Sequence, residues 1–148
     1  MADDTSRTGA SYATQKVLEY ANRVHVQHDP ALDQAFHAHE KHGIPAIQVG
    51  PSEGRTLHLL LKMIGARRVV EVGTLAGYSA IHMARALPDD GHLYSIEFEP
   101  LHARVARENL ELAGLSGRVT VLDGAGLQVL PTLEAKGPFD AVFIDADK

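Results

Sequence analysis

The sequence predicts an α/β fold in which helices flank a doubly wound, mostly parallel sheet. Four short runs rich in β-branched and apolar residues are typical of buried strands, and they recur at 69–72, 92–96, 119–122 and 141–144. The segments between them carry apolar residues at helical spacing, so strands and helices alternate along the chain. A turn punctuated by glycines after the first run makes the expected fold Rossmann-like.

Length and charge exclude several classes of protein. At 148 residues the chain is long enough for one ordinary domain with its own core. Its 14 Lys and Arg residues against 19 Asp and Glu residues give a net charge of -5, which argues against nucleic acid as the main partner. The absence of cysteine excludes disulfides and thiolate chemistry. The polar N-terminus and the short apolar runs predict a cytoplasmic protein with neither a signal peptide nor a membrane span.

Residues 1–65 are predicted to cap the sheet with helices, within a single domain over 1–148. After a polar stretch over 1–10, helices are expected over 11–27, 30–43 and 51–64. The middle helix carries several ionisable side chains whose spacing favours a solvated polar face over a metal site: His37, His39, Glu40 and His42.

Residues 66–148 hold the predicted strand and helix units, with helices over 78–87, 100–114 and 127–135. The last apolar run would be an unpaired edge strand with no helix to cover it, which is a liability for aggregation. We therefore expect this chain to be the front part of a longer protein, with roughly 60–90 residues missing at about 30 residues per βα unit. Alone, the chain is expected to associate through that strand or to be poorly stable.

The stretch from Glu71 to Ser79 follows the first strand with the pattern Glu-x-Gly-x-x-x-Gly-Tyr-Ser. It lacks the Gly-x-Gly-x-x-Gly fingerprint of dinucleotide-binding proteins, because Leu75 and Tyr78 stand where the second and third glycines would be. An acid at the mouth of the ligand crevice would repel a pyrophosphate and attract a cationic cofactor such as S-adenosylmethionine (SAM). The alternatives are a tight turn without a ligand and an NAD-dependent oxidoreductase, and the missing glycines count against the latter.

Further acids follow the other strands, at the edge where parallel sheets bind ligands. Glu97 lies 20 residues after Gly77, where an acid commonly binds the ribose hydroxyls of a nucleotide, although a solvated acid at a strand end is the alternative. Ser79 lies in the first turn of the next helix, so its hydroxyl can meet a carboxylate or simply cap the helix. Asp123 alone is uninformative, whereas the small residues at 124–126 leave room for an adenine ring.

The segment Asp145-Ala-Asp-Lys148 is the second informative cluster. Two carboxylates and an amine at one strand end can serve as a metal ligand, a second polar contact and a base. Mg²⁺ prefers one or two carboxylates together with waters and substrate oxygens. A solvated charged turn explains the same pattern.

Three motifs together resemble the cation-dependent class I O-methyltransferases, the family of catechol and caffeoyl-coenzyme A O-methyltransferases. They are the segments 70–79, 88–97 and 143–148, within a resemblance that runs from about residue 44 to 148. The resemblance implies a SAM site lined by Val49, Glu71, Gly73, Thr74, Ser79, Glu97, Gly126 and Asp147. It also implies two catalytic residues: Asp145 as a ligand of the cation and Lys148 as the base.

By this resemblance the expected reaction moves a methyl group from SAM to a hydroxyl of a small, catechol-like aromatic acceptor, assisted by a divalent cation such as Mg²⁺. A homodimer and the strand order third, second, first, fourth are also expected. The chain departs from the family at Ala125-Gly126, and it lacks the strand that carries the family's Asp-Asn pair of further metal ligands. A cofactor-binding fragment without catalysis is the alternative that such a truncation would produce.

Overall fold

The computed structural model describes residues 14–146, and its centre is a sheet of four parallel strands. The strands are β1 (Arg68–Val72), β2 (His92–Glu97), β3 (Val119–Asp123) and β4 (Ala141–Ile144). They lie in the order β3-β2-β1-β4, as the sequence predicted, so β1 and β2 are central and β4 is an edge. The predicted parallel α/β sheet is confirmed.

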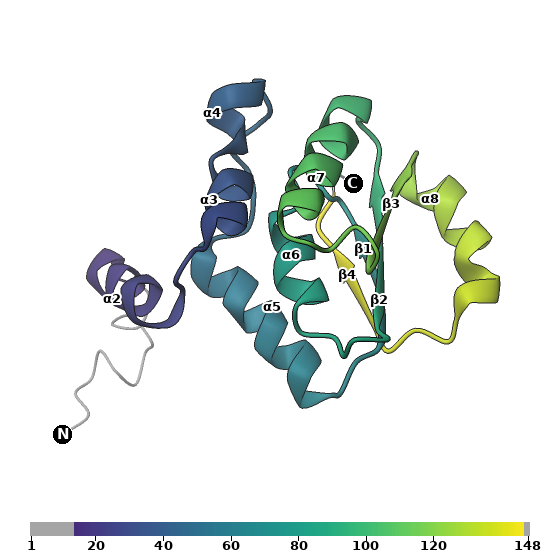
Figure 1. Cartoon of the computed structure of the whole chain (residues 1–148), viewed down its shortest axis with the longest axis horizontal. Coiled ribbons are helices and arrows are strands. Elements are labelled where there is room, and N and C mark those ends of the chain that lie inside the picture. Colours follow the sequence, from purple (N-terminus) through teal and green to yellow (C-terminus); the bar gives the residue numbers. More distant parts are fainter. Residues whose placement is uncertain (1–13, 147–148) are drawn as a thin grey trace.

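Helices cover the two faces of this sheet unequally (Figure 1). One face packs against α5 (Pro51–Met63), α6 (Tyr78–Ala84) and α7 (Pro100–Leu112). Among the described residues, the other face is covered by α8 (Gly126–Val129) and the 3-10 helix η1 (Leu130–Lys136). The first face holds the main core, in which alternate strand residues meet the helices: Val69, Leu93, Val119 and Val121 with Leu61, Ile81, Met83 and Leu110.

The sequence of β1 explains why this strand is central. Its neighbours Val69 and Val70 point to opposite faces, and both are buried, as a strand between two layers requires. Parallel pairing sets Val70 beside Tyr94 of β2 and Val142 of β4. Because all four strands run the same way, their carboxyl ends lie at one edge, and the residues that follow them are gathered there.

Three helices precede α5. Asp29 accepts the N–H of Leu32 at 2.9 Å, and Pro30 occupies the first turn that follows, so the cap predicted at this point is confirmed. Figure 1 shows the second and third of these helices near α6 and α7, with the first farther out. Their bounds are α2 (Gln15–His25), α3 (Pro30–Phe36) and α4 (Ala38–His42).

Two observed helices differ from the predicted ones. The single helix expected over 30–43 is wrong, because the chain breaks at His37. His37 still donates its N–H to the carbonyl oxygen of Asp33 at 3.0 Å, but its φ of -96° and ψ of 13° lie outside the helical region, so α3 ends there and α4 begins after it. The helix expected over 127–135 is α-helical only in its first turn and continues as η1, because Pro131 has no N–H to donate.

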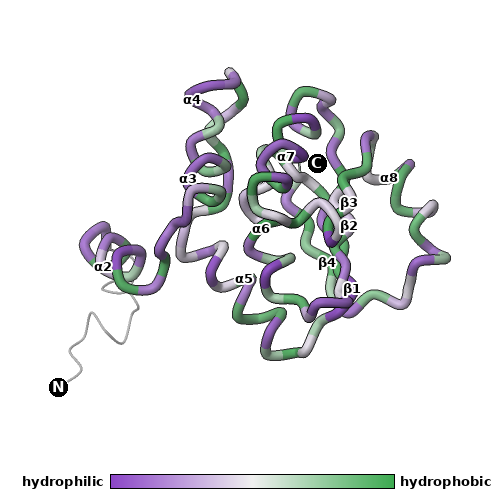
Figure 2. The backbone as a smooth tube through the Cα atoms, in the orientation of Figure 1, coloured by the Kyte–Doolittle hydropathy of each residue, from purple (hydrophilic) through white to green (hydrophobic). Residues whose placement is uncertain are grey.

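Figure 2 shows apolar residues along the strands and hydrophilic residues on α4. The helix α2 contributes no buried residue, and its apolar side chains Val17, Leu18, Tyr20 and Val24 are exposed. Within residues 14–146, no helix combines the length and the apolar content that crossing a bilayer needs.

Candidate functional site

The glycine loop, residues 73–77, joins β1 to α6 across the carboxyl end of the sheet. Gly73 has a φ of +100°, and a Cβ there would lie 2.1 Å from the carbonyl oxygen of Asp145. Gly77 precedes α6 with a φ of +82°. Glycine suits both positions because other residues rarely adopt a positive φ, and at Gly73 there is also no space for a side chain. The loop therefore brings the ends of β1 and β4 into contact.

Glu97, the last residue of β2, holds the backbone of this loop. Its Oε2 accepts the N–H groups of Thr74 at 3.0 Å and Leu75 at 2.8 Å, and its Oε1 accepts that of Glu99 at 2.9 Å. Glu97 is 7% exposed. Its contacts support Leu75 at a φ of +49°, a conformation that costs a residue with a Cβ about 1–2 kcal/mol. A carboxylate has about four acceptor positions, and the one left here is on Oε1, 3.6 Å from Nδ1 of His102. The expected ribose contact stays a prediction.

Glu71 lies inside β1 and bonds to α6 and β2. Ser79 donates its hydroxyl to Oε1, and Ser95 donates to Oε2 at 2.5 Å. Burial raises the pKa of Glu71 to about 7; the two serine hydrogen bonds oppose this rise, and the charges of Asp145 and Glu97 add to it. Glu71 is 0% exposed, so its carboxylate is buried beneath the carboxyl edge of the sheet, and the expected attraction of a cationic cofactor stays a prediction. The hydroxyl of Ser79 is bonded to Glu71 and does not cap α6, and its expected role in the cofactor site stays a prediction.

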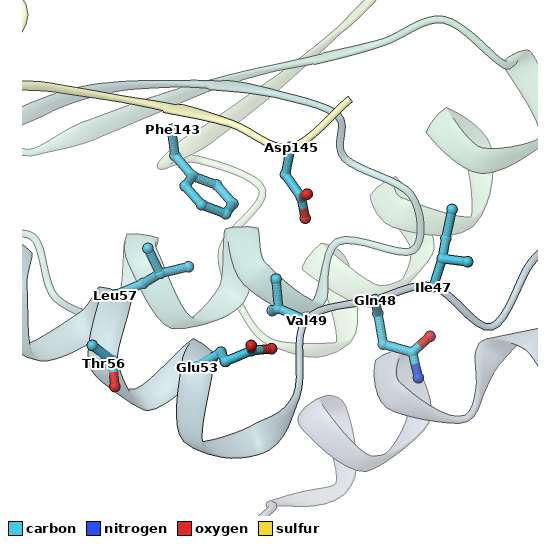
Figure 3. Close-up of a pocket in the computed structure, with 8 residues that line it drawn as sticks. All are labelled: Ile47, Gln48, Val49, Glu53, Thr56, Leu57, Phe143 and Asp145. Atoms are coloured by element: carbon cyan, nitrogen blue, oxygen red, sulfur yellow. The ribbon is translucent and has the colours of Figure 1, made fainter. Parts of the chain in front are cut away.

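A pocket of about 510 Å³ opens between α5, the segment before it and the end of β4 (Figure 3). Val49 and Asp145 both line it, and Figure 3 shows the carboxylate of Asp145 directed toward the α5 side. Phe143 and Leu57 supply an apolar wall, and Glu53 adds a second carboxylate. The lining therefore combines apolar surface with two acids: Ile47, Gln48, Val49, Glu53, Thr56, Leu57, Phe143 and Asp145.

The segment after β3 approaches the end of β1 from the other face of the sheet. Gly124 has a φ of +137°, and a Cβ at Gly126, the first residue of α8, would lie 2.9 Å from Cγ1 of Val72. Small residues are therefore needed where this segment passes β1. A contact of these residues with an adenine ring stays a prediction.

The residues expected to hold a divalent cation lie partly within the described chain. Asp145 offers one carboxylate in the pocket, which fits the oxygen ligands that Mg²⁺ prefers. Asp147 and Lys148 lie outside the described residues. Within residues 14–146, no three His, Cys, Asp or Glu side chains form a group that could hold a metal ion. The histidines at 37–42 therefore form no such group either.

Comparison with known proteins identifies the family. A family model described as O-methyltransferase matches residues 22–148. The chain belongs to this O-methyltransferase family. The resemblance inferred from the three sequence motifs is thereby confirmed.

Among curated members of the O-methyltransferase family, two bacterial relatives carry the name catechol O-methyltransferase. The one from Niastella koreensis is 48% identical over 122 residues, which cover 81% of this chain and 55% of the relative. The one from Mycobacterium tuberculosis is 50% identical over 120 residues, which cover 81% of this chain and 54% of the relative. The chain thus spans about half the length of the curated relatives it matches.

Solved O-methyltransferase structures share the fold. TomG from Streptomyces achromogenes, in complex with SAM, matches with a TM-score of 0.87 and 40% identity, covering 99% of this chain and 64% of TomG. The O-methyltransferase from Bacillus cereus, in complex with SAH, matches with a TM-score of 0.85 and 39% identity, covering 90% of this chain and 61% of that protein. The Rossmann-like class expected from the sequence is confirmed by these matches.

Two residues that shape the site were not predicted from the sequence. Ser95 bonds to Glu71 and also lies 2.5 Å from the hydroxyl of Thr74. The sequence feature that could have indicated Ser95 was a single serine beside apolar neighbours in the second strand. Glu53 accepts the N–H of Gly50 at 2.6 Å, and the three-residue spacing typical of a capping box was the available signal.

Proposed function

We propose that this chain is the cofactor-binding part of an O-methyltransferase that moves a methyl group from SAM to a hydroxyl of a small, catechol-like aromatic acceptor. The observation that carries the proposal is the grouping of Glu71, Glu97 and Asp145 around the glycine loop, where the charges of the latter two raise the pKa of the first. SAM carries a sulfonium and an ammonium, so an acidic site suits it better than it suits a pyrophosphate. The relatives' names and the SAM and SAH in related structures support the same assignment.

For the cofactor we propose contacts at the carboxyl ends of the strands and in the segments that meet them. Ser79 donates to the buried Glu71 and keeps its oxygen lone pairs for a donor such as the SAM ammonium. Glu97 keeps an acceptor position for a ribose hydroxyl. The proposed cofactor residues are Val49, Glu71, Gly73, Thr74, Ser79, Glu97, Gly126 and Asp147.

Asp145 is the proposed ligand of a divalent cation, with Mg²⁺ as the proposed ion. Bound there, the cation would act as a Lewis acid that lowers the pKa of a chelated catechol hydroxyl. Phe143 and Leu57 offer apolar contact to an aromatic ring in the same pocket. Lys148 is the proposed base for the hydroxyl proton, and alignment of acceptor and cofactor supplies the rest of the rate enhancement.

A homodimer is also part of the proposal. On α2 the exposed residues Val17, Tyr20 and Val24 recur at i, i+3 and i+7, so an apolar stripe is available to a second copy. Light scattering measures the oligomeric state directly. A mass that stays at the 16.0 kDa of one chain at high concentration would contradict the homodimer. The cytoplasmic location stays a prediction.

Ligand-dependent melting separates the proposal from its alternatives. We expect S-adenosylhomocysteine (SAH) to raise the Tm of the chain and NADH to leave it unchanged, whereas the reverse result would indicate an oxidoreductase. Methyl transfer to a catechol, measured with and without a metal chelator, then tests catalysis. Binding of SAH without transfer would favour the cofactor-binding fragment.

Substitution of Asp145 tests the metal assignment. In the full-length protein, Asp145→Ala should abolish metal-dependent methyl transfer while changing the Kd for SAH by less than about twofold, because the carboxylate is assigned to the cation. Asp123→Ala, at the end of β3, is the matched control and should retain transfer. A chelator without effect on the wild type, or transfer that survives in Asp145→Ala, would overturn the assignment.

A further inference from the structure

A buried asparagine on α7 connects the glycine loop to the N-terminal helices. Asn109 is 1% exposed, and its Nδ2 donates to the carbonyl oxygen of Ala76 at 2.8 Å. Its Oδ1 accepts from Nε2 of Gln34, on α3, at 2.9 Å. Ala76 belongs to the glycine loop, so two hydrogen bonds in series link α3 to the loop through α7.

The direction of these two bonds fixes the side-chain amide of Asn109. An amide presents donors on one side and an acceptor on the other, so the reversed orientation would set two oxygens against each other at Ala76. Because Gln34 donates to Oδ1, it keeps the NH₂ group of Asn109 facing the loop. Gln34 can therefore act on the loop through Asn109.

Apolar packing joins the same parts of the molecule. Ala76 is buried in a small cluster with Ala38 of α4, Ile44 and Val105 of α7, and Leu75 packs at its border. Figure 1 shows α3 and α4 on the side of the molecule that carries α7. The N-terminal helices are thus joined to the glycine loop by a shared apolar cluster as well as by the hydrogen bonds through Asn109.

We propose that Asn109 is a positioning residue for the glycine loop and that α3, through Gln34, tunes the affinity of the loop for the cofactor. The inference rests on the proposed function, because it takes this loop to be part of the cofactor site. Glu97 holds the N–H groups of Thr74 and Leu75, while Asn109 holds the carbonyl of the next residue, Ala76. A loop held at three successive residues presents its backbone to a ligand in one arrangement, and such preorganisation strengthens binding.

Calorimetric titration with SAH, well below the Tm, tests the proposal on the whole chain. Asn109→Asp keeps the acceptor for Gln34 but sets a carboxylate oxygen against the Ala76 carbonyl, and we expect a Kd about tenfold higher. Gln34→Ala removes only the outer bond and should raise the Kd about threefold. Asn22→Ala is the matched control, because it breaks the bond from Ser52 that joins α2 to α5 away from the loop, and its Kd should match the wild type.

Hydrogen exchange separates positioning from general destabilisation. The Gly77 N–H bonds to the Thr74 carbonyl at 2.8 Å, and it should exchange faster in Gln34→Ala while the β1 amides keep their protection. The inference would be overturned if both variants bound SAH with the wild-type Kd, or if their Kd rose no more than that of the Asn22→Ala control. If Asn109→Asp does not fold, Gln34→Ala decides alone. A wild-type chain that binds no SAH would overturn the proposed function, and the inference with it.

Discussion

Strands β1 and β4 lie side by side in the sheet, yet their side chains have different surroundings. Val70 pairs with Val142 in register, and Val72 pairs with Ile144. Val70 is buried beneath η1, whereas Val142 is 56% exposed and Ile144 is 71% exposed. The apolar side chains of the central strand are therefore covered on both faces, while one face of the edge strand is open in the part of the chain that the structure describes.

The acidic side chains of the central strands and of the edge strand also differ in their surroundings. Glu71 and Glu97, on the central strands, use their carboxylates to bond serine hydroxyls and the backbone of the glycine loop. Asp145, after the edge strand, directs its carboxylate into an open pocket (Figure 3). The difference indicates that the central acids use most of their hydrogen-bonding capacity within the protein, whereas the carboxylate of the edge acid lines the pocket.

The largest expected effect on stability is at Gly73, where the end of the central strand β1 contacts the end of the edge strand β4. Gly73→Ala should lower the free energy of unfolding by roughly 3 kcal/mol, because it adds a collision with the Asp145 carbonyl to the strain of a positive φ. Gly114→Ala is the matched control, since Gly114 has a φ of +70° but open space around it, and strain alone should cost about 1 kcal/mol. Urea unfolding measures both values, and equal losses would show that β4 moves aside at little cost.

On the central strand β1, we expect pH to change the free energy of unfolding by an intermediate amount. Burial raises the pKa of Glu71 from 4.5 to about 7, so between these values the folded state keeps a proton that the unfolded chain releases. Its contribution to stability is therefore fully present below pH 4.5 and is lost as the pH rises to 7. His82 has the opposite effect: burial lowers its pKa from 6.5 to about 4, so its contribution is present above pH 6.5 and is lost as the pH falls toward 4.

Glu71→Gln isolates the first of these two effects. Glutamine resembles the protonated acid, and serine hydroxyls can donate to it or accept from it. From pH 5 to 7.5, the free energy of unfolding of the variant should rise by roughly 2 kcal/mol relative to that of the wild type. Urea unfolding at several pH values measures this difference, in which the effect of His82 cancels. Parallel pH profiles for the two proteins would contradict the raised pKa.

Local patterns were sufficient to predict the strands and the glycine loop. Runs of β-branched residues identify buried strands because the alternating or continuous apolar pattern reflects which faces are covered. Gly73 and Gly77 identify the loop because positive φ and close backbone contact restrict those positions to glycine. Pro131 could also have ended the helix expected over 127–135, since its missing N–H is visible in the sequence.

Features that depend on partners distant in the sequence were not predictable in the same way. One of the two serine hydrogen bonds of the buried Glu71 comes from Ser95, which is brought to it by the pairing of β1 with β2. The link from Gln34 to Ala76 depends on Asn109, which comes from a third element. Sequence spacing carries no direct information on such contacts, because they follow from how whole elements pack.

The smallest effect is expected at the edge. Threonine has nearly the shape of valine, so Val142→Thr changes polarity with little change in volume, and it should alter the free energy of unfolding by less than about 0.5 kcal/mol at this exposed position. Val70→Thr, at the paired position on β1, should cost about 1–3 kcal/mol because it buries a hydroxyl among apolar side chains. Urea unfolding of the two variants compares the strands directly. If Val142→Thr lowers the free energy of unfolding as much as Val70→Thr does, β4 is covered in solution. Light scattering then tests whether a second copy of the chain covers it, because Val142→Thr should in that case also reduce association.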